Sequence, residues 1–303
     1  MNKLPNRVLV LNGLCSGKEC TPVLHPELEP WSKQFSRQKK NWLCHLPMTA
    51  LEWYLRFAGI TQPPAAFVAS QCDSIPEGTR QCWLATPYNA TVMRDWVRIS
   101  PLETLEWREQ DARWLSWLLN PLLAGEGLTM HAIGTNLLVT TLQSWKVQPV
   151  SYAEIDGQRL PNRHPDGEDG GRLMRLQSEI EMLLARDHQD CRRHSGVPMI
   201  SGVWFWGLSG WPVFGAAATP PPVQTSDPRL GSLVSVDESA DTAILHVSEF
   251  TELLSDIGIK PFPQELILAG QGCSVCLTPT LLPKLARDPW KPRECKKLES
   301  VYS

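Results

Sequence analysis

The stretch SGVWFWGLSGWP, residues 201–212, places four large aromatic side chains within eight residues of one another. Alternation along a β-strand would put Trp204 and Trp206 on one face and Phe205 on the other. Large aromatic side chains on both faces predict that at least one face lies in the core, and we favour the face of Trp204 and Trp206. The stretch therefore predicts a strand at the centre of the fold.

Glycines follow the aromatic run and predict the end of this strand. Gly207 and Gly210 favour a loop that turns sharply or allows something to approach the backbone closely. We expect residues 207–210 to form an exposed lip, with Trp211 and Pro212 beside it as a candidate contact surface.

The segment GRLMRLQSEIEMLLARDHQDCRRH, directly upstream, has the apolar spacing of an amphipathic helix. Because only a short loop joins it to the aromatic strand, we expect the helix to pack its apolar stripe against that strand. The stripe consists of Leu173, Leu176, Ile180, Leu183 and Leu184.

Composition limits the class of protein. The chain has 303 residues, of which 42 % are hydrophobic and 20 % charged, with a net charge of −3. This length allows one large or two modest domains, and the weak charge predicts neither nucleic acid nor an anionic membrane as partner. The apolar run at residues 8–11 is too short for a signal peptide or a membrane span. We therefore expect a cytoplasmic protein.

The rest of the chain mixes strands and helices, which predicts an α/β fold with a mixed sheet and flanking helices. We expect the domain ranges to be an N-terminal α/β region at 1–150, the loop, long helix and Trp-rich strand at 151–217, a Pro/Ser-rich linker at 218–240 and a C-terminal strand-helix-strand region with tail at 241–303. Within them we expect a strand at 7–12, a helix at 47–58 ended by Gly59, two strands around a turn at Pro87 to Asn89, a helix within 101–125, a strand pair at 128–142, a surface loop at 152–171, and strand, helix and strand at 242–279.

Cysteines and histidines give little sign of a metal centre. The nine cysteines are odd in number and without a secretory signal, so we expect reduced thiols. Cys273 and Cys276 have the C-x-x-C spacing, but without a second pair we favour structural thiols in a strand over a metal or redox site. The seven histidines are scattered, and we expect neither a metal nor a cofactor.

The helix and the aromatic strand together carry a family resemblance. Residues 173–212 resemble the RpfE-type regulatory proteins, bacterial proteins often labelled cofactor-independent phosphoglycerate mutase homologues, and a fainter similarity covers residues 80–215. The matching residues are Leu173, Arg175, Leu176, Gln177, Glu179, Met182, Leu183, Leu184, Trp204, Gly207 and Gly210. Archaeal-type phosphoglycerate mutases carry a similar W-x-W-G segment, so the resemblance implies an alkaline-phosphatase-like architecture in a degenerate form.

The same comparison argues against retained catalysis. Phosphoryl transfer in that superfamily needs two metal ions, usually with an Asp at the end of the first strand, where this chain has Asn12. We therefore expect a regulatory or binding protein with an unidentified protein or small molecule as partner and no catalytic residues. A divergent phosphoglycerate mutase-like enzyme is the alternative, and a structural subunit of a complex is the second. The candidate binding residues are Arg175, Gln177, Glu179, Trp204, Trp206, Gly207, Ser209, Gly210 and Trp211.

Overall fold

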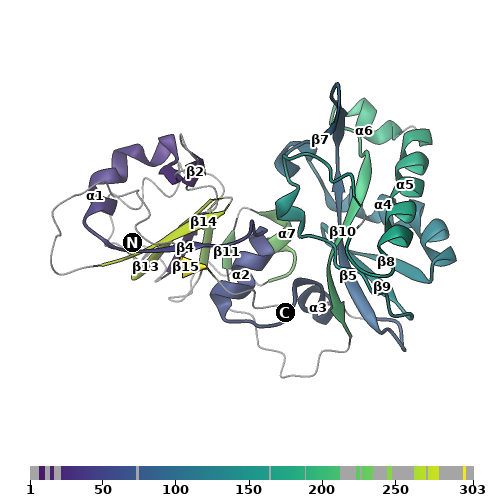
Figure 1. Ribbon diagram of the computed structural model, residues 1–303, viewed down its shortest axis with the longest axis horizontal. Helices are drawn as coiled ribbons and strands as arrows, with labels where there is room; N and C mark the ends of the chain where they lie inside the picture. Colours follow the sequence, from purple (N-terminus) through teal and green to yellow (C-terminus); the bar gives the residue numbers. More distant parts are fainter. Residues whose placement is uncertain are drawn as a thin grey trace. The chain divides into compact units, whose positions relative to one another are not determined.

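The computed structural model describes residues 7–10, 14–16, 22–72, 75–163, 165–187, 189–211, 223–225, 227–234, 244–247, 263–270, 272–279 and 296–297. The chain forms two compact units (Figure 1). The first unit combines residues 1–60 with 219–303, and the second spans residues 61–218.

The first unit is built on a seven-stranded mixed sheet with the order β11-β12-β1-β13-β14-β4-β15. β1 runs parallel to β12 and β13, whereas β14 runs antiparallel to β13 and β4. Apolar residues of β1, β13 and β14 form its core together with Phe35 and Trp42. Its elements are β1 (Arg7–Val10), β2 (Leu14–Ser16), β3 (Pro22–Leu24), η2 (Pro26–Trp31), α1 (Ser32–Ser36), β4 (Lys39–Cys44), α2 (Ala50–Ala58), β11 (Val223–Thr225), α7 (Pro228–Gly231), β12 (Ile244–Val247), β13 (Glu265–Ala269), β14 (Cys273–Thr278) and β15 (Lys296–Lys297).

Local sequence explains the ends of α2. The Thr49 hydroxyl accepts a hydrogen bond from the Glu52 backbone N–H, and the Glu52 carboxylate accepts one from the Thr49 N–H, which completes a capping box. At the other end Gly59 adopts a left-handed conformation with φ of 69°. The predicted helix and its stop at Gly59 are therefore confirmed.

The second unit is built on a four-stranded antiparallel sheet with the order β10-β5-β9-β8. α4 and α5 cover one face of this sheet (Figure 1), while α3 packs against β5, β9 and β10. Its elements are α3 (Pro64–Ser70), β5 (Gln81–Tyr88), β6 (Ala90–Val92), β7 (Val97–Ile99), η3 (Leu102–Leu105), α4 (Glu109–Gly125), β8 (Leu128–Ile133), β9 (Asn136–Thr141), η4 (Tyr152–Glu154), α5 (Gly170–Arg186), α6 (Asp190–His194) and β10 (Gly202–Gly210).

The expected mixed α/β architecture is confirmed, but three local predictions are wrong. Pro87 does not begin a turn, because β5 continues through it opposite Val203 of β10, and the hairpin turn falls later, at residues 94–95. Residues 265–279 form two antiparallel strands rather than one. Cys44 forms a disulfide, whereas we expected reduced thiols, because the spacing of cysteines in the sequence does not show which of them lie close together in the fold.

Other expectations have mixed standing. Cys273 and Cys276 lie in a strand as predicted, and neither is disulfide-bonded. None of the helices in the described part of the chain has the length and apolarity that crossing a membrane requires. The expected domain ranges divide the chain into consecutive segments and stay a prediction. The first compact unit combines residues from both ends of the chain, and its sheet pairs β1 with β12. Asn12, Pro212 and the helix expected after β12 lie outside the described residues.

Candidate functional site

The aromatic strand is β10, and both of its faces are buried. Trp204 and Trp206 are 6 % and 4 % exposed on one face, where their indole N–H groups donate to the Val150 carbonyl at 3.0 Å and the Thr86 hydroxyl at 2.9 Å. Phe205, fully buried on the other face, packs edge-on against Trp83 in the core beneath α4 and α5. These tryptophans therefore hold the sheet and its neighbours together.

The glycine segment after Trp206 remains part of the strand. Gly207 has φ of 65° and lies at an irregularity in the pairing with β5, after which Ser209 and Gly210 pair opposite Cys82 and Gln81. Ser209 is buried and only Gly210 is exposed, so the expected lip at residues 207–210 is wrong. The Trp211 backbone N–H donates to the Arg80 carbonyl at 2.8 Å, which continues the pairing past the strand end.

The predicted binding residues of the helix point in different directions from α5. Gln177 is buried, whereas Arg175 and Glu179 lie on the outer side of the helix with guanidinium and carboxylate 4.0 Å apart. Arg175 also lies 3.7 Å from Glu126 at the end of α4, and Arg172 contacts the same carboxylate at 2.6 Å. The structure therefore distributes the predicted residues over the strand and two sides of the helix, and their role in binding stays a prediction.

The predicted packing of the helix against the aromatic strand is confirmed. Leu173, Leu176, Ile180 and Leu184 are buried in one cluster with Val203 and Phe205 of β10. The helix packs against the Phe205 face of the strand, and the face of Trp204 and Trp206, which we favoured as core, is buried as predicted.

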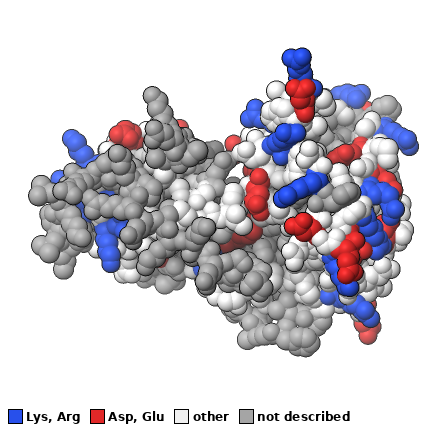
Figure 2. Space-filling model, in the orientation of Figure 1, with Lys and Arg blue, Asp and Glu red and all other residues white. Residues whose placement is uncertain are grey.

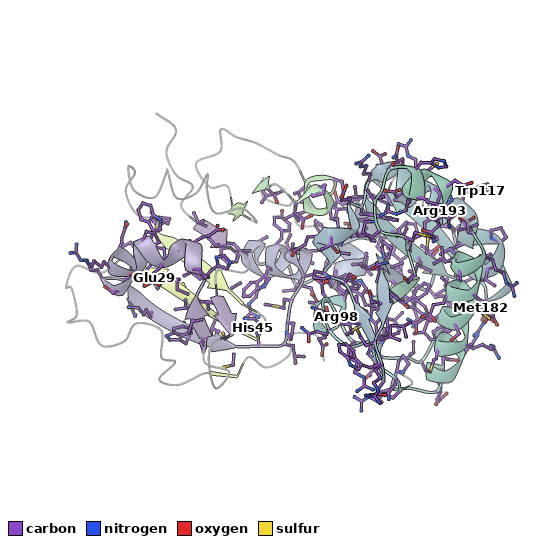
Figure 3. All side chains as sticks on the ribbon, turned by 90° about the horizontal axis from the view of Figure 1, so that it is seen from above. Glu29, His45, Arg98, Trp117, Met182 and Arg193 are labelled. Atoms are coloured by element: carbon purple, nitrogen blue, oxygen red, sulfur yellow. The ribbon has the colours of Figure 1, made fainter. Side chains whose placement is uncertain are left out.

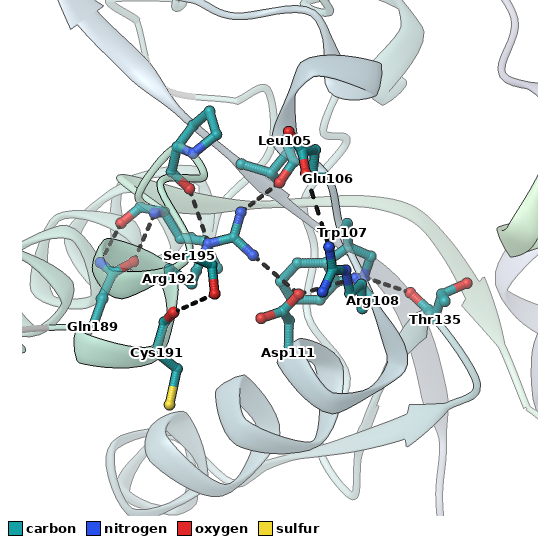
Figure 4. Close-up of polar contacts among 12 residues, drawn as sticks. Leu105, Glu106, Trp107, Arg108, Asp111, Thr135, Gln189, Cys191, Arg192 and Ser195 are labelled. Atoms are coloured by element: carbon teal, nitrogen blue, oxygen red, sulfur yellow. Dashed lines mark hydrogen bonds and ion pairs between the residues drawn. The ribbon is translucent and has the colours of Figure 1, made fainter.

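A buried arginine anchors the segment between α5 and β10 (Figure 4). The Arg192 guanidinium lies 3.0 Å from the Asp111 carboxylate without hydrogen-bond geometry, and it donates to the carbonyls of Leu105 and Pro198. Nearby, the Gln189 side chain makes two 2.8 Å hydrogen bonds to the backbone of Ile200. The side chains of Arg192 and Gln189 point at Asp111 and at backbone groups of the protein. They therefore hold the segment between α5 and β10 in place and leave no open site for a ligand.

A second buried contact joins the sheet to α5. The Tyr88 hydroxyl donates to the Glu181 carboxylate at 2.5 Å, and burial, with the charge of Glu181 beside it, raises the pKa of Tyr88. Gly202 lies opposite Tyr88, and a Cβ there would lie 2.3 Å from the hydroxyl oxygen. This contact needs glycine at 202 and has a structural role.

An open groove of about 450 Å³ lies where the segment after β9 meets the start of α5. Its charged side chains, Lys146 and Glu168, pair with each other at 3.0 Å, so the groove presents no unpaired charge to a ligand. Its lining residues are Trp145, Lys146, Val147, Gln148, Gly167 and Glu168. Across the part of the chain that the structure describes, no three His, Cys, Asp or Glu residues gather as a metal site would require.

The hairpin formed by β6 and β7 carries exposed apolar side chains. Val92, Met93 and Trp96, around its turn, are 81 %, 41 % and 37 % exposed. The Met93 N–H donates to the Trp96 carbonyl at 2.8 Å and closes the turn. The sequence patterns did not lead us to expect this hairpin, because we placed the turn at Pro87. The signal was present, since the residues on both sides of Arg94 and Asp95 suit strands.

Comparison with known proteins gives only weak structural similarity. No family model matches the chain, and no curated protein matches it. The cofactor-independent phosphoglycerate mutase of Thermoplasma acidophilum aligns with 92 % of this chain and 90 % of its own, with 11 % identity and a TM-score of 0.37. A protein of Pyrococcus horikoshii aligns with 89 % of this chain and 86 % of its own, with 8 % identity and a TM-score of 0.38. Similarity at this level identifies neither a family nor an activity.

Proposed function

We propose that this chain is a binding protein of regulatory type that contacts a partner protein through the hairpin β6–β7. The observation that carries the proposal is the exposure of Val92, Met93 and Trp96 around one turn. Exposed apolar side chains gathered in one place are typical of interaction sites, and Trp and Met are enriched in protein interfaces. The resemblance to RpfE-type proteins agrees with a function in binding.

The hairpin is held firmly at its base. Ile99 is fully buried, its N–H donates to the Gln158 carbonyl at 2.9 Å, and the Leu160 N–H donates to the Val97 carbonyl at 2.9 Å. A rigid base reduces the entropy that binding would cost. The predicted residues Trp204 and Trp206, both buried, would serve this function by supporting the sheet next to the hairpin.

The test places a photo-reactive amino acid at position 96 and, as a control, at position 117. Trp117, on α4, is 75 % exposed and is labelled in Figure 3. We expect irradiation in the native host to give one defined protein adduct from position 96 and none from position 117. A variant with Val92→Ser and Met93→Ser should lose that adduct while its melting temperature stays unchanged.

Other outcomes would support the alternatives. Interconversion of 3- and 2-phosphoglycerate above background, in a coupled assay with added manganese, would favour the mutase-like enzyme. An adduct from position 117 and none from position 96 would overturn the hairpin as contact surface. Purification only as part of a fixed stoichiometric complex would favour the structural subunit.

A further inference from the structure

Two arginines lie directly opposite each other beside the hairpin. Arg98 of β7 forms an isolated antiparallel bridge with Arg159. The flanking backbone hydrogen bonds run from Ile99 N–H to the Gln158 carbonyl and from Leu160 N–H to the Val97 carbonyl. Arg98 and Arg159 therefore form a non-hydrogen-bonded antiparallel pair. In that pair type the Cα atoms are about 4.5 Å apart and the side chains leave the sheet on the same side.

This pair of like charges has no acidic partner in the described part of the chain. Both arginines are exposed, and neither forms an ion pair with a residue that the structure describes. Like charges directly opposite in a sheet are destabilising. A bound anionic group would remove that cost.

The arginines share their face with two of the three exposed apolar side chains of the hairpin, Met93 and Trp96, whereas Val92 lies on the opposite face. Arg98 pairs with Thr91 and lies two residues from Trp96, so alternation places Trp96 on the same face, with Met93 opposite it. Figure 2 shows Lys and Arg side chains around the end of the second unit that carries β7 in Figure 1. We call Met93, Trp96, Arg98 and Arg159 the arginine face.

We propose that the arginine face binds an acidic segment of the partner protein, with its carboxylates between Arg98 and Arg159 and its apolar side chains against Trp96 and Met93. This inference rests on the proposed function and adds the chemistry of the partner. Guanidinium groups bind carboxylates in bidentate geometry, which suits two arginines side by side.

The composition of the face favours protein over nucleic acid or membrane. Trp, Met and Arg are enriched in protein interfaces and Lys is depleted, and the arginine face contains no Lys. Single-stranded nucleic acid requires successive aromatic platforms, whereas this face has one aromatic residue. Binding to anionic membranes is typical of clusters of about four to eight basic residues, whereas the arginine face has only Arg98 and Arg159.

The experiment uses the full chain and fluorescence anisotropy with a labelled peptide of alternating Glu and Val residues. We expect the wild-type protein to bind this peptide, and to bind the Lys-Val counterpart at least about tenfold more weakly. Arg159→Glu should weaken binding of the Glu-Val peptide by at least about tenfold and raise the melting temperature, because it places an opposite charge beside Arg98. Arg193→Glu, at an exposed site on α6 labelled with Arg98 in Figure 3, is the matched control and should leave binding unchanged.

Three results would overturn the inference: no binding of the Glu-Val peptide, equal loss of binding in the Arg193→Glu control, or tighter binding of oligothymidylate or phosphatidylserine vesicles that Arg159→Glu abolishes. The proposed function has its own readout. If position 96 still cross-links one protein and Arg159→Glu does not change that adduct, the hairpin binds a partner, but not through acidic groups.

Discussion

At the scale of single residues, Gly207 is a position where a substitution would cost free energy through backbone conformation and not through steric overlap. Its φ of 65° is disfavoured for other residues, yet the nearest atom to an added Cβ would be 3.9 Å away. Gly207→Ala should therefore cost about 1–2 kcal/mol from conformation alone. Gly210, with open space and no positive φ, is the control and should tolerate Ala within about 0.5 kcal/mol. Urea unfolding of both variants measures this, and equal costs would contradict it.

A second residue, Cys82, predicts a dependence of stability on pH. Burial in β5 raises the pKa of its thiol from 9.0 to about 12. Between these values the folded state keeps a proton that the unfolded state has released, so stability falls as pH rises. Below pH 9 both states are protonated and the effect vanishes.

Cys82→Ala should flatten this decline between about pH 9 and pH 11. The control is Cys191→Ala, which removes an exposed thiol and should leave the wild-type profile. Urea unfolding across that pH range gives the free energies. Identical slopes for the wild type and Cys82→Ala would refute the assignment.

At the scale of elements, α5 provides a matched pair of sites. Leu176 is 1 % exposed in the core cluster, whereas Met182 on the same helix is 52 % exposed. Leu176→Ala should cost about 2–5 kcal/mol because it removes buried methyl groups and leaves a cavity. Met182→Ala should change the free energy of unfolding by less than about 0.5 kcal/mol. Thermal and urea unfolding measure both variants. Equal losses of stability in Leu176→Ala and Met182→Ala would contradict this packing.

The Arg192 anchor predicts a different pattern, because its charge is buried. Arg192→Met should cost about 3–5 kcal/mol, since it leaves the Asp111 carboxylate buried beside no cation. Adding Asp111→Leu should recover much of that loss. Arg113→Met, which removes an exposed ion pair with Glu109, should cost less than about 0.5 kcal/mol. A double variant no more stable than Arg192→Met alone would show that the hydrogen bonds to Leu105 and Pro198 dominate.

Local pattern predicted elements better than it predicted their partners. The apolar stripe of α5 and the cap of α2 are periodic or short-range signals, and both were recovered. We placed a turn at Pro87 because proline usually interrupts strands. In the structure Pro87 lies within β5, opposite Val203 of β10. The pairing of β1 with β12 and β13 joins residues more than two hundred positions apart, and no local pattern contains it.

The candidate site was harder still to predict. Trp204 and Trp206 were chosen because of their size, but size alone does not distinguish a contact surface from a core. The hairpin was missed because the turn was placed at Pro87, and the exposure of its side chains is a property of the folded chain that residue patterns do not contain.

At the scale of the whole molecule, the second unit is continuous in sequence and closes its own sheet and core. We therefore expect a fragment of residues 61–218 to fold cooperatively by itself, with a single urea transition and native-like near-ultraviolet circular dichroism. A fragment of residues 1–60 should stay unfolded, because β1 would lack both of its neighbours. Failure of the 61–218 fragment to fold would show that it depends on the rest of the chain.

The pairing of β1 also sets an order of events during synthesis. β1 leaves the ribosome before the strands on both of its sides, which follow only after residue 243. At about 5–20 residues per second, the nascent β1 waits on the order of ten seconds to a minute, during which the second unit can fold. Through that interval Val8 and Val10, buried in the finished protein, have no sheet to enter. A chaperone that binds apolar nascent segments would therefore bind this chain at β1, and synthesis that stops before residue 244 would give a folded second unit attached to an unfolded first one.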